Sequence, residues 1–203
     1  MSDKGISLSS STVVAVSILK EALGRASITL KSLLHFGGKT DEGFVVQAVA
    51  LPWREIVRRL AQDPKFLYEI DWRAMEELIA GAYKQYGCPD VVLTPRSGDK
   101  GRDVIATWPG QGAIRVMDQV KAYSPGHLVT PDEVRSMLGV LSGEGNVSKG
   151  VITTSSDFAP SVRNNPQIAQ FLPFRLELVN GDELVKWLLG TKKAAEPPAR
   201  TDG

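Results

Sequence analysis

The chain has 203 residues, 42% of them hydrophobic and 23% charged, and a net charge of +1. This composition is ordinary for a globular protein and excludes the strong basicity of a non-specific nucleic-acid coat. One cysteine excludes an intramolecular disulfide, and two histidines are too few for an ordinary zinc site. No apolar run approaches the roughly 20 residues that cross a bilayer, and no secretory signal is evident. We therefore expect a cytoplasmic protein without membrane contact.

Residues 1–66 form a first segment whose role the sequence leaves open. Its predicted elements are a helix near 17–23, a glycine-rich turn over 37–43, a strand over 44–50 and a helix that Pro52 opens. The segment could serve as a recognition module, as a dimerisation element or as an extension packed on the following domain.

A helix is predicted from the N-cap Asp71 to about Tyr86. Glu76 falls within an apolar stripe on this helix, whereas Glu77 lies outside it; the stripe contains Trp72, Ile79 and Tyr83. A carboxylate on an apolar face is costly unless it is paired or bound to metal, which makes Glu76 the more interesting acid. Spacing alone leaves two interpretations of Glu76 open. Its side chain could reach solvent at the edge of the stripe, or it could be a residue of the active site.

A β-hairpin is predicted after the glycine-rich loop Ser97–Gly101, with strands over 102–108 and 113–122 and a turn over 109–112. Asp103 lies on the first strand, and Gln119 and Lys121 share one face of the second. Asp103 and Gln119 offer the hard oxygen ligands that a divalent cation needs, and Lys121 could orient a water or neutralise charge on a phosphate. This combination suggests a metal-dependent phosphodiesterase.

The remaining pattern predicts helices that alternate with strands. Thr130 and Glu133 form a predicted capping box that opens a helix to about 141. The elements expected after it are a strand over 151–153, a helical stretch within 160–171, a strand over 175–179 and a helix over 182–189. This order predicts an α/β/α sandwich around a central mixed β-sheet, preceded by a small α+β segment. The tail, residues 191–203, is predicted to be disordered.

Five runs carry a family resemblance, in the order MEELIAGAYKQYG, TPRSGDKGRDVIA, DQVKAY, KGVITTSSDF and LELVNGDELVKWLL. Together they resemble the Mrr-type restriction endonuclease domain of the PD-(D/E)xK nuclease superfamily, with the domain at 67–190. The resemblance implies a restriction-endonuclease-like fold and a catalytic set of Glu76, Asp103, Gln119 and Lys121. It also implies that Asp103, Gln119 and Glu76 bind Mg²⁺, for which Mn²⁺ can substitute. Gln119 stands where the wider superfamily has an acid, and Mrr-like members resemble this chain in having Gln.

The implied function is a metal-dependent DNA endonuclease that restricts foreign or modified DNA. A DNA-repair or junction-cleaving nuclease uses the same chemistry and stays open, as does a non-catalytic DNA-binding module on a nuclease scaffold. Cutting both strands with one active site per protomer favours a homodimer.

Other polar and aromatic residues have two interpretations each. The predicted DNA-binding residues of the glycine-rich loop are Arg96, Gly98, Lys100 and Arg102, although this loop could equally be a tight turn with solvated charges. His127 and the run Thr153–Ser155 could contact phosphate or serve the local structure. Asp118 is expected to form a salt bridge at the hairpin edge. Core or rim packing is expected, rather than stacking on an extruded base, for Trp53, Trp108 and Tyr123.

Overall fold

A computed structural model describes residues 32–95 and 102–190 of the chain. The chain divides into two units, Met1–Ser32 and Leu33–Gly203, and the description below concerns the second. The predicted helix near 17–23, the glycine-rich loop and the tail over 191–203 lie outside the described residues. Within the described ranges, no helix combines the length and apolar character that a membrane crossing requires.

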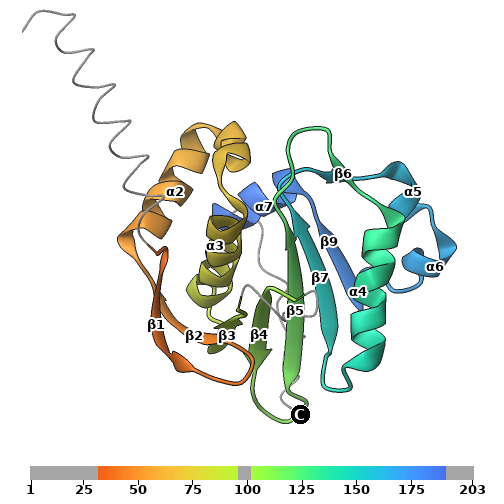
Figure 1. Ribbon diagram of the computed structural model, residues 1–203, viewed down its shortest axis with the longest axis horizontal. Coiled ribbons are helices and arrows are strands. Elements are labelled where there is room, and N and C mark those ends of the chain that lie inside the picture. The colour runs from red at the N-terminus through yellow and green to blue at the C-terminus, as the bar shows by residue number, and fades with distance from the viewer. Residues whose placement is uncertain (1–31, 96–101, 191–203) are drawn as a thin grey trace, which may run out of the picture. The chain divides into compact units, whose positions relative to one another are not determined.

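A seven-stranded mixed sheet forms the centre of the described part, in the order β1-β2-β3-β4-β5-β7-β9 (Figure 1). Its strands are β1 (Leu34–Lys39), β2 (Phe44–Val49), β3 (Asp90–Leu93), β4 (Val104–Trp108), β5 (Ile114–Lys121), β7 (Lys149–Thr154) and β9 (Leu176–Val179). Neighbours from β1 to β5 are antiparallel, whereas β5, β7 and β9 are parallel. The parallel pairs require crossovers, which the helices between the strands supply.

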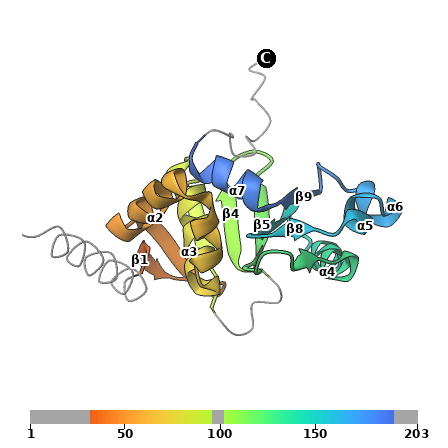
Figure 2. The same cartoon turned by 90° about the horizontal axis from the view of Figure 1, so that it is seen from above.

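Helices cover both faces of this sheet, which confirms the predicted α/β/α architecture. The helices are α2 (Leu51–Gln62), the 3-10 helix η1 (Pro64–Glu69), α3 (Trp72–Gln85), α4 (Pro131–Gly143), α5 (Pro160–Arg163), α6 (Pro166–Ala169) and α7 (Gly181–Leu188). Figure 2 shows α7 and α4 on opposite sides of the strands. On the side of α7, α3 packs on the sheet and α2 packs on α3. The short strands β6 (Leu128–Val129) and β8 (Asp157–Phe158) form a separate two-stranded parallel sheet.

The N-caps of α3 and α4 lie at the residues that the sequence predicts. The Asp71 side chain accepts hydrogen bonds from the N–H groups of Arg73 and Ala74, each at 3.0 Å, and starts α3 where predicted. The predicted capping box of Thr130 and Glu133 is present at the start of α4.

Four of the described strands were not predicted, namely β1, β3 and the two-residue strands β6 and β8. β1 runs through Gly37 and Gly38, which the sequence places in a turn, and the short β3 follows directly after the end of α3. β1 forms a hairpin with the adjacent β2, and this pairing outweighs the weak local preference of glycine for strands. β3 depends on pairing with the distant β2 as well as with β4. Through β1 and β2 the segment before residue 67 contributes to the same sheet as the predicted nuclease domain, so the expected division at 66 and 67 does not coincide with a gap in the packing.

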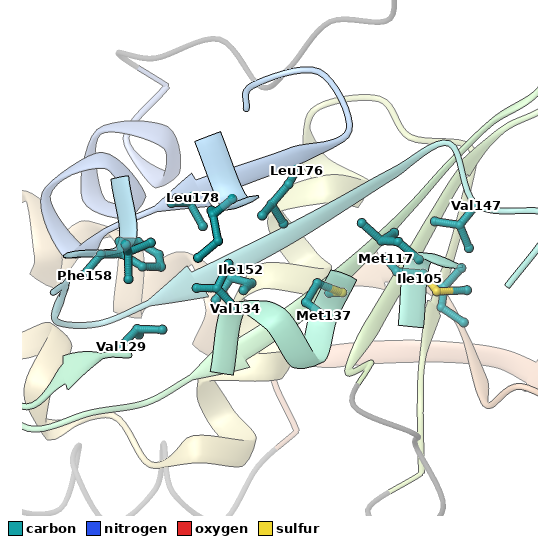
Figure 3. Close-up of a cluster of buried hydrophobic side chains, with 13 residues drawn as sticks. Ile105, Met117, Val129, Val134, Met137, Val147, Ile152, Phe158, Leu176 and Leu178 are labelled. Carbon is teal, nitrogen blue, oxygen red and sulfur yellow. The ribbon is translucent and has the colours of Figure 1, made fainter. Parts of the chain in front are cut away.

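The core on the α4 side is continuous and apolar. Figure 3 shows Ile105, Met117 and Ile152 of the sheet facing Val134 and Met137 of α4. All five side chains are fully buried. Side chains alternate along β4 and β5, so Asp103, Gln119 and Lys121 share the α4 face with Ile105 and Met117.

Asp118 lies on the opposite face and differs from the expectation. β5 lies between β4 and β7 inside the sheet, so the Asp118 side chain is buried and the predicted edge salt bridge is wrong. The Tyr83 hydroxyl and Thr153 Oγ1 instead donate to Asp118 Oδ2, at 2.9 and 3.0 Å. Burial raises the pKa of Asp118 to about 7, against the lowering effect of these hydrogen bonds.

Gly81 allows α2 to pack closely on α3. A Cβ at Gly81 would lie 2.3 Å from Trp53 Nε1, and this indole is held by a 2.9 Å hydrogen bond to Leu78 O. We expect Gly81→Ala to lower the free energy of unfolding by about 1–3 kcal/mol because the rigid indole must move. The matched control is Gly139→Ala on α4, where a Cβ meets nothing within 4 Å, and it should not destabilise the protein. Urea unfolding of both variants measures the difference, and equal stabilities would contradict this account.

The buried Asp118 makes stability pH-dependent. Its pKa in the folded protein lies above the unfolded value, so the folded state holds the proton more tightly and stability falls as pH rises from about 4 to about 7. We expect the stability of Asp118→Asn relative to the unsubstituted protein to improve by about 1 kcal/mol per pH unit between pH 5 and 7. Urea unfolding at pH 5, 6, 7 and 8 in EDTA tests this. A constant difference would show that Asp118 does not titrate in that range.

Candidate active site

Asp103 is fixed where β4 begins and β5 nears its end. Its N–H donates to Asp118 O at 3.0 Å, which extends the pairing of the two strands by one residue. Its carboxylate Oδ2 accepts a 2.7 Å hydrogen bond from the N–H of Val120. The carboxylate is therefore held against the backbone that joins Gln119 to Lys121, and it is 8% exposed.

Gln119 supplies a buried amide oxygen beside Asp103. Within the described ranges, its Oε1 accepts no hydrogen bond although the atom is buried. A buried acceptor left unsatisfied costs about 1–3 kcal/mol. Such an atom on the strand that pairs with Asp103 suits a hard cation, since carboxylate and amide oxygens are the ligands that Mg²⁺ and Ca²⁺ take.

The acidic groups are too dispersed to form an all-acid metal site. Among residues 32–95 and 102–190, no three Asp, Glu, His or Cys side chains are grouped closely enough to hold a metal ion. A cation at the end of the hairpin would therefore need the amide of Gln119 in addition to Asp103.

Glu76 is buried on α3 and carries an ion pair. It is 6% exposed, and Arg73 Nη1 donates to its Oε2 at 2.6 Å. The interpretation in which Glu76 reaches solvent is therefore wrong. Glu77 has a structural role, because its Oε2 accepts the N–H of Leu33 at 2.7 Å.

Arg73 also connects Glu76 to the hairpin. Its Nη1 donates to Thr94 O at 3.2 Å, and the Thr94 N–H donates to Asp103 O at 3.0 Å. Neither Arg73 nor Thr94 was predicted from the sequence as a site residue. The spacing of three between Arg73 and Glu76 on a helix was a usable signal, whereas nothing local in the sequence indicates Thr94.

Lys121 ends β5 with its backbone fixed and its amine near an acid. Thr154 Oγ1 and the Ser155 N–H donate to Lys121 O at 2.9 and 3.1 Å, so these two residues hold the strand end and favour the structural interpretation of this run. The Lys121 Nζ lies 3.8 Å from Glu133 Oε1, and its side chain is 23% exposed.

The predicted DNA-binding loop is described only at its last residue. Arg96, Gly98 and Lys100 lie outside the described residues. Arg102 Nη1 donates to Glu144 Oε1 at 2.7 Å, and the Arg102 side chain is 13% exposed. Its charge is thus balanced by the acid at the end of α4.

The three aromatic residues pack as expected in the core or at its rim. Trp53 is buried under α3, and Trp108 lies edge-on to Tyr83 with ring centroids 6.4 Å apart. Tyr123 stacks on His127 at 4.1 Å, which gives this loop histidine a local structural partner.

One family model and two solved structures are similar to this chain. Residues 67–188 match the family model described as restriction endonuclease, the Mrr catalytic domain. MspJI restriction endonuclease, solved in complex with a 27-mer oligonucleotide, shares 17% identity over 70% of this chain and 31% of its own, with a TM-score of 0.41. AspBHI, a DNA modification-dependent restriction endonuclease, shares 22% identity over 79% of this chain and 40% of its own, with a TM-score of 0.39. Among curated proteins, none matches this chain.

The family match begins at η1 and ends at α7, so it contains the four residues that the hairpin and α3 contribute to the candidate site. It covers more than half of the 203 residues. The chain belongs to the restriction endonuclease family, and it spans less than half the length of the two solved structures it matches.

Proposed function

We propose that this protein is a Mg²⁺-dependent DNA endonuclease that hydrolyses phosphodiester bonds in foreign or modified DNA. The observation that carries the proposal is the unpartnered Gln119 Oε1 on the strand paired with the buried Asp103. An oxygen that lacks a partner among residues 32–95 and 102–190 is explained if a cation completes its coordination.

Asp103, Gln119 and Glu76 are the proposed ligands. A bound Mg²⁺, or Mn²⁺ in its place, would polarise the scissile phosphate and acidify a water. Asp103 keeps its orientation because the Val120 N–H occupies one carboxylate oxygen. Arg73 pairs with the buried Glu76 and balances its charge.

Lys121 is the proposed group that orients the attacking water and offsets charge on the phosphate. Its ammonium is a donor of three hydrogen bonds, and its position at the end of β5 puts it two residues from Gln119 on the same face. A nucleophile derived from water makes a covalent enzyme intermediate unnecessary. We further propose that the protein acts as a homodimer, since two protomers supply two sites for a double-strand cut.

A non-catalytic DNA-binding module is the second candidate. It is favoured by the dispersal of the acidic groups in the described part of the chain, which leaves a metal with few charged ligands. A repair or junction-cleaving role shares the chemistry of the first candidate, and cleavage of methylated against unmethylated plasmid separates that role from restriction of modified DNA.

We expect the protein to cleave plasmid DNA with Mg²⁺ and to lose about 100-fold or more of that activity in Asp103→Asn and in Lys121→Ala, because each removes a group that acts on charge in the transition state. Asp90→Asn, an exposed strand aspartate, and Lys65→Ala, an exposed lysine, are matched controls that should cleave normally. Gel analysis of plasmid conversion measures the rates. Cleavage that persists in both site variants would refute the assignment.

Metal binding should also be visible without DNA. We expect Mn²⁺ to raise the melting temperature, because a ligand at 100 times its Kd adds about 2.7 kcal/mol of stability. Gln119→Met should keep or raise the stability of the metal-free protein, since it removes a buried unpaired oxygen, and it should lose the Mn²⁺ effect. Thermal melts in EDTA and in a Mn²⁺ series measure both quantities. An equal Mn²⁺ shift in Gln119→Met would exclude the amide as a ligand.

A further inference from the structure

Glu133 is held rigidly at the start of α4. Its Oε2 accepts hydrogen bonds from the N–H and the Oγ1 of Thr130, each at 2.9 Å. Its Oε1 accepts the Tyr123 hydroxyl and lies 3.8 Å from Lys121 Nζ. Both oxygens are thus engaged, and the carboxylate has a fixed position beside the lysine of the candidate site.

Tyr123 is anchored on the other side of this carboxylate. Its N–H donates to Ser155 Oγ and its carbonyl accepts from the same hydroxyl, both at 2.7 Å. Its ring stacks on His127 with an interplanar angle of 13°. Burial and the adjacent Glu133 raise the pKa of Tyr123 to about 12, so the hydroxyl remains a donor at neutral pH.

The backbone of Lys121 is fixed, whereas its side-chain ammonium can change position. Its carbonyl is held by Thr154 and Ser155, whereas four methylenes separate its Cα from the amine. A carboxylate at 3.8 Å attracts the ammonium without taking a full hydrogen bond. This attraction restricts the position of the Lys121 ammonium, and its N–H donors stay available to a water or a phosphate.

We propose that Glu133, held by Thr130 and Tyr123, is a positioning residue that sets the location of the Lys121 ammonium for DNA cleavage. This inference rests on the proposed function. The competing explanation is that Glu133 only caps α4. The chain offers a direct comparison, because Asn180 and Glu183 form the same capping box at the start of α7.

The test compares Glu133→Gln with the matched control Glu183→Gln. Glutamine serves as well as glutamate at this position of a capping box, so both variants should fold and melt like the unsubstituted protein. We expect the single-turnover cleavage rate of Glu133→Gln to fall by about 10- to 100-fold, because a displaced catalytic group loses its alignment. DNA affinity, measured in Ca²⁺, should stay within about twofold. Glu183→Gln should change neither quantity.

Two further variants keep the test decisive. Tyr123→Phe leaves the capping box whole and should lower the cleavage rate in the same direction. In a Lys121→Ala background, Glu133→Gln should cause no additional loss, since both substitutions act through one group. Unchanged cleavage in Glu133→Gln and Tyr123→Phe, alongside loss in Lys121→Ala, would overturn the inference.

A spectroscopic measurement separates this inference from the proposed function. The lysine Nζ resonance that disappears in Lys121→Ala identifies Lys121 by NMR, and we expect it to shift in Glu133→Gln but not in Glu183→Gln. A protein that cleaves no DNA refutes the proposed function, whereas a Lys121 resonance that is insensitive to Glu133 refutes the positioning contact.

Discussion

The antiparallel pairing of β4 with β5 is the constraint on which the candidate active site depends. Its register joins Val104 to Asp118 and thereby sets Asp103 against the N–H of Val120. A slip of one residue would exchange the two faces of β5 and bury Gln119 against α3. The same register places Ile105 and Met117 in the core beneath α4. One strand register therefore fixes both the apolar core and the polar site.

Charges around the site are balanced in fixed pairs. Glu76 pairs with Arg73, Lys121 faces Glu133 and Arg102 pairs with Glu144, each cation with a partner from a helix. Charged residues from helices on both faces of the sheet therefore set the electrostatics at the end of the β4–β5 hairpin. Both helical layers thus contribute to one site. Partly buried pairs of this kind resist salt more than exposed ones.

Two neighbouring residues of β5 show how stability and function are divided. Asp118 Oδ2 accepts two hydrogen bonds, whereas Asp118 Oδ1 and Gln119 Oε1 are buried and accept none in the described part of the chain. The carboxyl stabilises the packing of α3 on the sheet when it is protonated. The amide lowers stability unless something outside the chain satisfies it, as functional sites often do. Three of the four proposed site residues thus lie on the α4 face of the hairpin, whereas Glu76 comes from α3.

The sequence by itself determined the helix starts, the hairpin and the faces of Asp103, Gln119 and Lys121, because caps, turns and the two-residue strand period are local properties. The family motif added Glu76, whose burial no local rule decides. Only the tertiary structure placed β3 between β2 and β4, buried Asp118 and brought Glu133 to Lys121. These outcomes depend on which distant segments become neighbours, and that is fixed by packing of the whole sheet between its helices rather than by any short stretch of residues.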